Sequence, residues 1–275
     1  MRVFNTTLAA IFLCLTTVSW AAAQNLQSHC IALVDNEFSD IRFAAFGEGL
    51  TPEDVKITYI DHSMYLIETP TGRGIVTDYN GLGGSIVPDV VTMNNAHSSH
   101  WTAVPHPEIE HVLRGWGDGV TPADHRLTLD DEVLIRNVTT DIRSSYTGQT
   151  ADGNSIFIIE VAGLCIGHLG HLHHEPSEAQ YAAIGRLDVV MAAVDGGMTV
   201  PLPTMMRIVS RLRSSVVLPM HWFGRSTLEA FLRGMSEEFE VEVMDGASMT
   251  ISLRTLPRKP TIRVLQPRYL APDFD

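Results

Sequence analysis

Basic residues are scarce in this chain. Its 275 residues include 19 Lys and Arg against 32 Asp and Glu, which gives a formal net charge of −13 at pH 7 with the histidines neutral. A protein with this charge repels phosphate backbones and anionic lipid surfaces. We therefore expect neither nucleic acid nor a peripheral membrane surface as its partner; the sequence does not indicate an oligomeric state.

Charged and aromatic residues are also few, at 19% and 7% of the chain, and the sequence contains no internal repeat and no low-complexity tract. Hydrophobic residues make up 45% of the chain and the mean hydropathy is +0.08. This composition excludes a disordered, collagen-like or coiled-coil protein. It supplies enough apolar material for one large domain or two small ones.

An apolar run long enough to span a bilayer is missing as well. The N-terminus carries Arg2, an apolar run over residues 8–15 and the small-residue triplet Ala21–Ala23, which is the layout of a secretory signal peptide. A membrane anchor is disfavoured because Thr16 and later polar residues interrupt the run before it reaches about 20 residues. We expect cleavage after Ala23, a periplasmic or secreted protein, and no membrane span after cleavage.

Cysteine is rare, with three in the whole chain, and Cys14 would leave with the signal peptide. The remaining pair, Cys30 and Cys165, could form a disulfide in an oxidising compartment. Cys165 lies in an apolar run typical of a buried strand, where a free cysteine acts as a small hydrophobic residue. The sequence therefore allows the bridge but does not favour it.

Short apolar runs separated by turn residues dominate the chain from residue 55 onward. Their length and alternation predict strands over 55–60, 64–68, 74–77, 90–93, 132–138, 155–161 and 164–167. After residue 176, predicted helices over 177–185, 201–213 and 226–235 alternate with strands over 188–194, 215–219, 241–243 and 249–253. This order predicts an α+β fold of two mixed sheets with helices on the outer faces.

The rest of the chain carries weaker signals. Residues 24–54 form an N-terminal segment, and residues 101–131 are rich in Pro, Gly, His and Asp, which predicts long loops around one strand at 109–114. Trp101, Arg114 and Trp116 in this region are expected to shape a substrate site. The main domain is predicted to cover residues 55–256, followed by an extended tail over 257–275.

The twelve histidines cluster at the ends of predicted strands. His97 and His100 follow the strand at 90–93, a second group begins at His168 and His171, and His221 directly follows the strand at 215–219. Three strand ends that each deliver an imidazole can surround one ion and leave positions open for water and substrate. Each histidine taken alone could instead be a polar surface residue or a core residue. This alternative is disfavoured because the histidines occur together at three strand ends.

These segments resemble the metallo-β-lactamase-fold hydrolases, in particular the branch that contains ascorbate-phosphate lactonase-like proteins. The resemblance covers roughly residues 55–225 and rests on five segments in order: Thr58–Ser63, Ile75–Asp78, Asn95–His100, His168–His171 and Leu218–His221. It implies a four-layer αββα sandwich with its metal site at the strand ends. The order and context of the five segments make this expectation specific.

Several family ligands are replaced in this chain. Asn95 and Ser99 stand where the family has a histidine and an aspartate ligand, and His171 stands at the position of the aspartate that bridges two metals. A further family histidine is expected after residues 132–138, where this sequence offers Asp141. Amide and hydroxyl oxygens are poorer ligands for zinc than imidazole or carboxylate, so the usual two-zinc site is not expected.

What remains is sufficient for one Zn²⁺ or another divalent transition metal per chain, since three imidazoles and water form a known catalytic arrangement. The resemblance places His100, His171 and His221 around this ion, with His97 and Asp141 as helpers and His168 as either a ligand or a group that orients one. Further residues are expected to support the ligand imidazoles without binding the metal, namely His62, Asp78, Asn95 and Ser99.

The resemblance implies that the partner is a small-molecule substrate, an ester, lactone, amide or phosphodiester, which a metal-activated water hydrolyses. Because Ser99 replaces the family aspartate that handles protons, Asp141 or a histidine would have to act as the acid or base. The alternative is a non-catalytic metal- or ligand-binding protein on a hydrolase scaffold whose chemistry was lost with its ligands. Replacement of carboxylates by imidazoles fits a changed metal site better than a decayed one.

Overall fold

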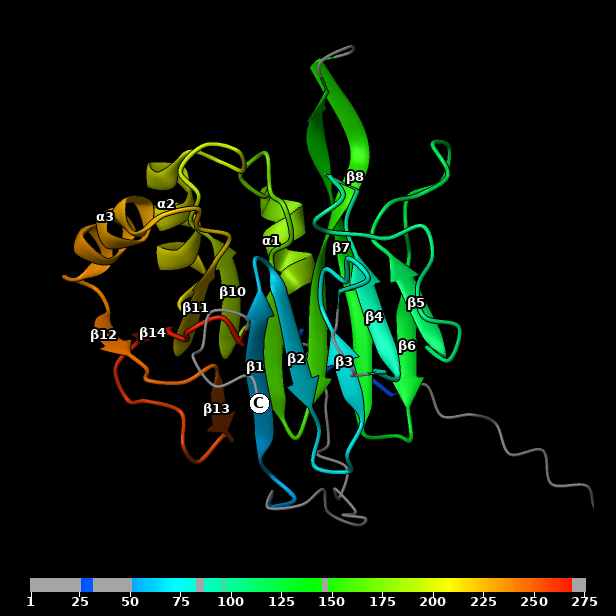
Figure 1. Cartoon of the computed structure of the whole chain (residues 1–275), viewed down its shortest axis with the longest axis horizontal. Helices are drawn as coiled ribbons and strands as arrows, with labels where there is room; N and C mark the ends of the chain where they lie inside the picture. Colours follow the sequence, from blue (N-terminus) through cyan, green and yellow to red (C-terminus); the bar gives the residue numbers. More distant parts are fainter. Residues whose placement is uncertain (1–25, 32–50, 83–86, 96, 145–147, 269–275) are drawn as a thin grey trace, which may run out of the picture.

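The structure is a computed structural model that describes residues 26–31, 51–82, 87–95, 97–144 and 148–268. The predicted signal peptide, residues 1–23, lies outside the described residues. Two mixed β-sheets lie face to face, and three helices accompany them (Figure 1). This arrangement confirms the predicted α+β class. No helix among the described residues is both long and apolar enough to cross a bilayer.

The first sheet has six strands in the order β13-β1-β2-β3-β4-β5. These are β1 (Val55–Asp61), β2 (Met64–Glu68), β3 (Gly74–Val76), β4 (Val90–Met93), β5 (His111–Arg114) and β13 (Ser248–Ile251). β1, β2 and β3 form an antiparallel meander, whereas β4 runs parallel to both β3 and β5. The turn between β2 and β3 contains Gly72, whose φ of 88° suits glycine best.

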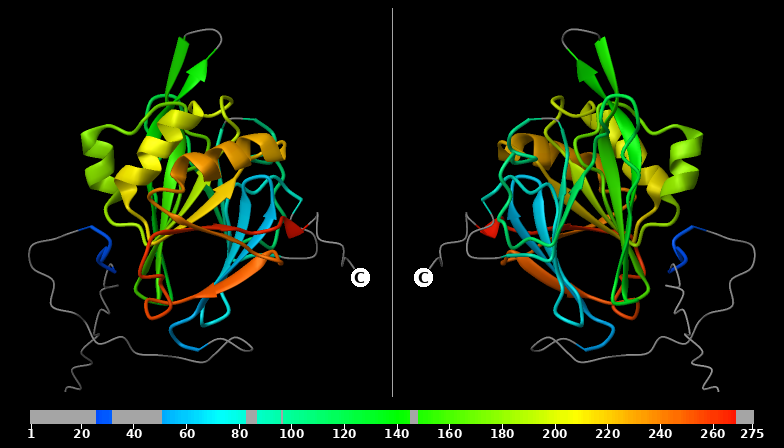
Figure 2. Two further views of the ribbon diagram at one scale, coloured as in Figure 1. Left: turned by 90° about the vertical axis from the view of Figure 1, so that its left-hand side faces the viewer. Right: turned by 90° about the vertical axis from the view of Figure 1, so that its right-hand side faces the viewer.

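The second sheet has eight strands in the order β12-β14-β11-β10-β9-β8-β7-β6. Their bounds are β6 (Arg126–Leu129), β7 (Val133–Ser144), β8 (Gly148–Val161), β9 (Leu164–His168), β10 (Val189–Ala193), β11 (Val216–Met220), β12 (Glu240–Val243) and β14 (Thr261–Val264). β9, β10 and β11 are parallel neighbours, so their carboxyl ends meet at one edge of the sheet. The β7–β8 hairpin projects beyond that edge (Figure 1, Figure 2).

The helices are α1 (Glu178–Ile184), α2 (Leu202–Leu212) and α3 (Arg225–Met235). α1 begins with a capping box in which Ser177 and Gln180 bond each other's backbone N–H groups. α2 turns Met205, Ile208 and Val209 inward. Because α1 packs on β7, α2 on β10 and α3 on α2, the eight-stranded sheet is covered on its outer face. This explains why β9, β10 and β11 are buried at every position.

Cys30 and Cys165 form a disulfide across 135 residues of sequence, the bridge that the sequence allowed but did not favour. Residues 26–31 dock beside β8 and β9 of the eight-stranded sheet. Ser28 Oγ donates to the buried Glu160 carboxylate at 2.6 Å, and Arg186 N donates to Cys30 O at 2.9 Å. These bonds bring the two cysteines together, which the local sequence around Cys165 could not indicate.

Two other sequence predictions need correction. Residues 261–264, predicted to belong to an extended tail, form β14 between β11 and β12, so the domain continues past residue 256. Residues 126–129, predicted to be loop, form the edge strand β6. Both segments are four residues long and become strands through pairing with a neighbour, a non-local effect that periodicity does not capture.

Candidate metal centre

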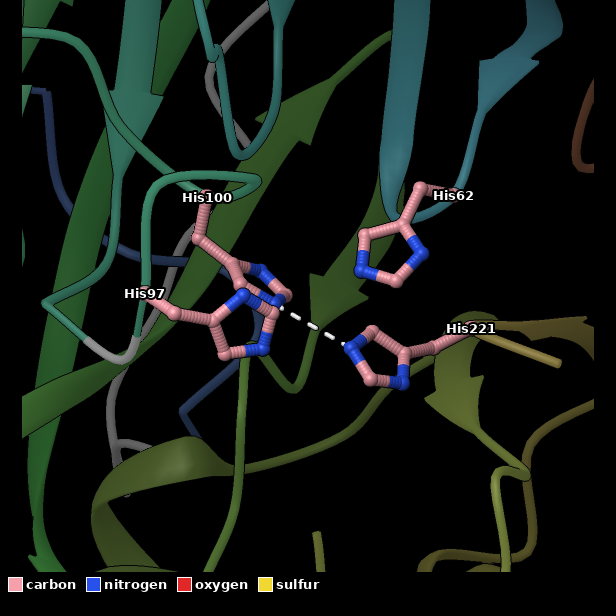
Figure 3. A group of neighbouring side chains, drawn as sticks. All are labelled: His62, His97, His100 and His221. Atoms are coloured by element: carbon pink, nitrogen blue, oxygen red, sulfur yellow. Dashed lines mark hydrogen bonds between the residues drawn. The ribbon is translucent and has the colours of Figure 1, made fainter. Parts of the chain in front are cut away.

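Histidines from loops of both sheets converge at one edge of the fold. His62 lies in the turn between β1 and β2, His97 and His100 follow β4, and His221 follows β11. One nitrogen of each lies within 4.8 Å of one nitrogen of every other, and the rings point toward one another (Figure 3). His171, in the loop after β9, adds a fifth ring, with centroids 4.9 Å from His100 and 5.0 Å from His97.

The backbone fixes where two of these loops meet. His62 and His221 have left-handed φ values of 49° and 59°, which turn the chain sharply at the strand ends. His221 N donates to His62 O at 2.8 Å, and Tyr59 Oη donates to the same oxygen at 2.6 Å. The turn from the six-stranded sheet is therefore tied to the strand end from the eight-stranded sheet.

The inner nitrogens have the spacing of ligands around one ion. His100 Nε2 lies 3.2 Å from His221 Nε2, and His97 Nε2 lies 3.3 Å from His171 Nε2. Zinc–nitrogen bonds of about 2.0–2.1 Å at tetrahedral angles place ligand nitrogens about 3.3–3.4 Å apart. His62 Nε2, His171 Nδ1 and His221 Nδ1 are buried and have no hydrogen-bond partner among the described residues, although His221 Nδ1 lies within ion-pair distance of Asp195 Oδ2. The donor set and its unpartnered nitrogens therefore fit a divalent transition metal.

The opposite ring nitrogens face groups that orient the imidazoles. His100 Nδ1 lies 2.6 Å from Asp78 Oδ2, His221 Nδ1 lies 3.1 Å from Asp195 Oδ2, and His97 Nδ1 lies 2.7 Å from Ser99 Oγ. A carboxylate that accepts the Nδ1 proton leaves the Nε2 lone pair free for a metal. The outer contacts of His100 and His221 thus favour the tautomer that a metal ligand needs.

Asp78 is fully buried and is held as an anion. Burial alone would raise its pKa, but the charges of His168 and His100, with hydrogen bonds from His100 and Asn94, lower the pKa well below its usual range. Asn94 Nδ2 donates to Asp78 Oδ1 at 2.7 Å, and Asn94 Oδ1 accepts from Ser155 N at 2.8 Å. Asp78 is therefore placed where its predicted orienting role requires it.

Three of the clustered histidines, His62, His97 and His171, are neutral at neutral pH. Burial, helped by neighbouring imidazoles, lowers the pKa of His62 to about 3, of His97 to about 4 and of His171 to about 2. Neutral imidazoles bind metals, whereas protonated ones cannot. These three rings are therefore available as ligands without a change in protonation.

Two predicted site residues make other contacts. His168 donates from Nε2 to Ser63 O at 2.9 Å and accepts at Nδ1 from Gly170 N at 3.2 Å, so both nitrogens are engaged and the orienting alternative fits better than the ligand one. Asp141 accepts bonds from Asp152 N and from the Gln149 amide, both within the β7–β8 hairpin. This placement does not support a catalytic role for Asp141.

Sequence reasoning missed two supporting residues and underrated His62. Asn94, which is buried, supports the site through Asp78, whereas Asn95 beside it is exposed. Asp195 follows β10, between the strands that deliver His171 and His221. The carboxyl ends of parallel neighbours share one sheet edge, so the position of Asp195 after its strand was the signal that could have found it.

Asp195 lies in a loop that it organises itself. Its Oδ1 accepts N–H bonds from Gly197, Met198 and Thr199 at 2.6–3.0 Å, and Thr199 Oγ1 donates to Oδ2 at 2.7 Å. Burial raises the pKa of Asp195, but the hydrogen bonds from His221, Thr199 and Gly197 lower it well below its usual range. The carboxylate beside His221 therefore stays charged.

Replacement of Asp195 by Asn is expected to weaken metal binding by about 10- to 100-fold, as loss of an orienting partner typically does. The side chain keeps its size but loses the charge that faces His221 Nδ1. Asp141→Asn is the matched control and should leave the affinity unchanged. Competition with a chromogenic chelator measures both variants, and equal weakening in the two would show that Asp195 has no special role.

The comparisons with known proteins agree with this fold and site. The family description "Beta-lactamase superfamily domain" matches residues 56–221, which include β2 to β11 and all five clustered histidines. The chain belongs to the beta-lactamase superfamily. The predicted resemblance to the metallo-β-lactamase fold is confirmed.

Three similar proteins illustrate this relationship. A metallo-beta-lactamase superfamily protein from Thermotoga maritima is 24% identical, with a TM-score of 0.57, covering 78% of this chain and 100% of its own. The metallo hydrolase Igni18 from Ignicoccus hospitalis is 19% identical, with a TM-score of 0.53, covering 73% and 99%. A UPF0173 protein of Pyrococcus abyssi is 20% identical over 194 residues, 65% of this chain and 90% of that protein. The two solved structures support the fold, and the UPF0173 relative fits the predicted branch.

Proposed function

We propose that this chain is a hydrolase that uses one divalent transition-metal ion, such as Zn²⁺, held by clustered imidazoles. The observation that carries the proposal is the spacing of inward Nε2 atoms, 3.2 and 3.3 Å apart, together with the outward Nδ1 atoms of His97, His100 and His221, which face a hydroxyl or a carboxylate. His100 and His221 would be its firmest ligands, with His62, His97 and His171 completing the shell. Such an ion lowers the pKa of a bound water to about 7 and polarises a carbonyl or phosphoryl oxygen.

The residues of the chain then have separate roles. Asp78 and Asp195 hold the Nδ1 sides of His100 and His221, and their negative charges offset part of the charge of a dication. Asp195 is a poor proton acceptor because its pKa is lowered, so we assign it orientation and not proton transfer. The family relationship supports hydrolysis of an ester, lactone, amide or phosphodiester.

The proposal is tested by a hydrolysis screen on chelator-treated protein before and after one equivalent of Zn²⁺, Mn²⁺ or Fe²⁺ is restored. The substrates are p-nitrophenyl acetate, a butyrolactone, a simple amide and bis(p-nitrophenyl) phosphate. We expect activity on at least one of them that the chelator abolishes and a metal restores. Tight metal binding with no hydrolysis of any substrate would favour the non-catalytic metal-binding alternative.

We also infer that the protein is exported to the periplasm or secreted. The layout of residues 1–23 supports this, and so does the Cys30–Cys165 bridge, because disulfides persist mainly in oxidising compartments. Mass spectrometry of the protein recovered from an expressing cell should find Gln24 at the N-terminus. An N-terminus that retains residues 1–23 would contradict the inference.

A further inference from the structure

Phe223 is an exposed aromatic residue that lies against two of the clustered histidines. Its ring centroid is 5.2 Å from that of His221 and 5.4 Å from that of His62. The side chain nevertheless remains 64% exposed. Single exposed apolar residues are common on protein surfaces, so exposure alone says little. The position of Phe223, in contact with two candidate ligands, is what makes it informative.

The chain holds Phe223 in this outward position. Trp222 packs inward, with its ring centroid 5.3 Å from that of Tyr59, which is buried in the core. Gly224 is the N-cap of α3 and ends the short connection that begins after β11. With Trp222 anchored on one side and α3 on the other, Phe223 has little freedom to fold back into the core.

A second exposed apolar side chain stands on a neighbouring loop. Met198 is 50% exposed and belongs to the loop that Asp195 organises next to His221. This loop lies close to the start of α3. Gly196 approaches the Thr227 side chain so closely that a Cβ atom at this glycine would be 3.3 Å from Thr227 Cγ2. Two loops at the histidine cluster therefore present apolar side chains to the outside.

No Arg or Lys side chain of the described residues forms a hydrogen bond or ion pair with the five imidazoles, although Arg143 binds the loop beside His221. Among the described residues, the side chains that contact the five imidazoles are carboxylates, hydroxyls, other imidazoles and Phe223. Arg143 donates its guanidinium to the carbonyls of Gly197, Met198 and Thr199. Phosphoryl groups are typically bound by Arg or Lys. The side chains around the clustered histidines therefore suit an uncharged substrate better than a phosphoryl substrate.

We propose that Phe223 is a specificity-determining residue that docks the apolar acyl chain of a neutral ester or lactone beside the histidine cluster. The assignment of a reaction rests on the proposed hydrolase function, whereas the docking of an apolar chain can be tested by binding alone. An acyl chain that covers the exposed ring removes apolar surface from water, which favours longer chains by up to about fourfold per buried methylene.

The experiment compares wild type, Phe223→Ala and Phe223→Leu, each loaded with the same metal and checked for equal metal content. Val243→Ala is the matched control, since Val243 is also 64% exposed but lies on the edge strand β12. The substrates are p-nitrophenyl acetate, butyrate, hexanoate and octanoate, which share one leaving group, together with bis(p-nitrophenyl) phosphate. A second arm measures binding of acetate, hexanoate and octanoate by calorimetry.

We expect kcat/KM to rise with chain length in wild type and in Val243→Ala. The octanoate-to-acetate ratio should fall at least tenfold in Phe223→Ala and much less in Phe223→Leu. If wild type hydrolyses no ester, the hydrolase assignment fails. The role of Phe223 is then decided by calorimetry, in which the preference for octanoate over acetate should fall in Phe223→Ala and much less in Phe223→Leu. The proposal is overturned if Phe223→Ala keeps the wild-type dependence on chain length, if wild type shows none in either arm, or if the phosphodiester is the better substrate.

Discussion

Replacement of His100 by alanine is expected to lower metal affinity by more than the roughly 10- to 100-fold cost of losing an orienting partner, and to abolish metal-dependent hydrolysis. His100 is fully buried, and its two nitrogens lie 2.6 Å from Asp78 Oδ2 and 3.2 Å from His221 Nε2. The variant therefore loses one ligand and leaves the Asp78 charge without its main partner.

Plasma emission on dialysed protein measures the loss. His106→Ala is the control, because His106 is exposed and makes no contact with the clustered histidines in the described part of the chain. His100→Gln separates the two effects, since an amide can still donate to Asp78 but is a poor ligand. Full metal content in the alanine variant, with its fold verified, would remove His100 from the site.

The second large expected effect concerns the Cys30–Cys165 bridge. Conversion of both cysteines to alanine should lower the free energy of unfolding by about 2–5 kcal/mol. The bridge closes a loop of 135 residues in sequence, so its removal frees the unfolded chain, and it also releases the segment held by Ser28 and Glu160.

Denaturant unfolding with and without reductant measures this effect. Reductant should lower the unfolding midpoint of wild type and leave that of the double variant unchanged. Metal content should stay the same in both, because the bridge connects the N-terminal segment to β9 and makes no contact with the clustered histidines. Equal midpoints for oxidised wild type and the double variant would show that the bridge does not stabilise the fold.

The local pattern of the sequence was sufficient for most of the elements. Strands such as Val90–Met93 and Val216–Met220 are short, continuously apolar and bounded by turn residues, and helices begin at recognisable caps such as Ser177. The histidines could be predicted as one cluster because they follow strands whose ends share an edge. A histidine that directly follows a strand in the sequence therefore lies at that edge in the fold.

What could not be predicted depends on contacts between distant segments. β14 forms because residues 261–264 fit between two parallel strands, and Cys30 reaches Cys165 only after the N-terminal segment docks on Glu160. His62 joins the cluster because its carbonyl is tied to the N–H of His221. Asp141 lies where the resemblance predicts a ligand histidine, but its carboxylate accepts a bond from Asp152 N within its own hairpin.

The most direct test of the metal centre is metal analysis combined with X-ray absorption spectroscopy on the protein as purified and after reconstitution. The arrangement predicts about one transition-metal ion per chain with a shell dominated by imidazole nitrogens at about 2.0–2.1 Å for zinc. His221→Ala should reduce the nitrogen count and the bound metal together, because His221 Nε2 is one of the inward-facing atoms. Protein that binds no transition metal, or that binds two ions in a carboxylate-rich shell, would contradict the account.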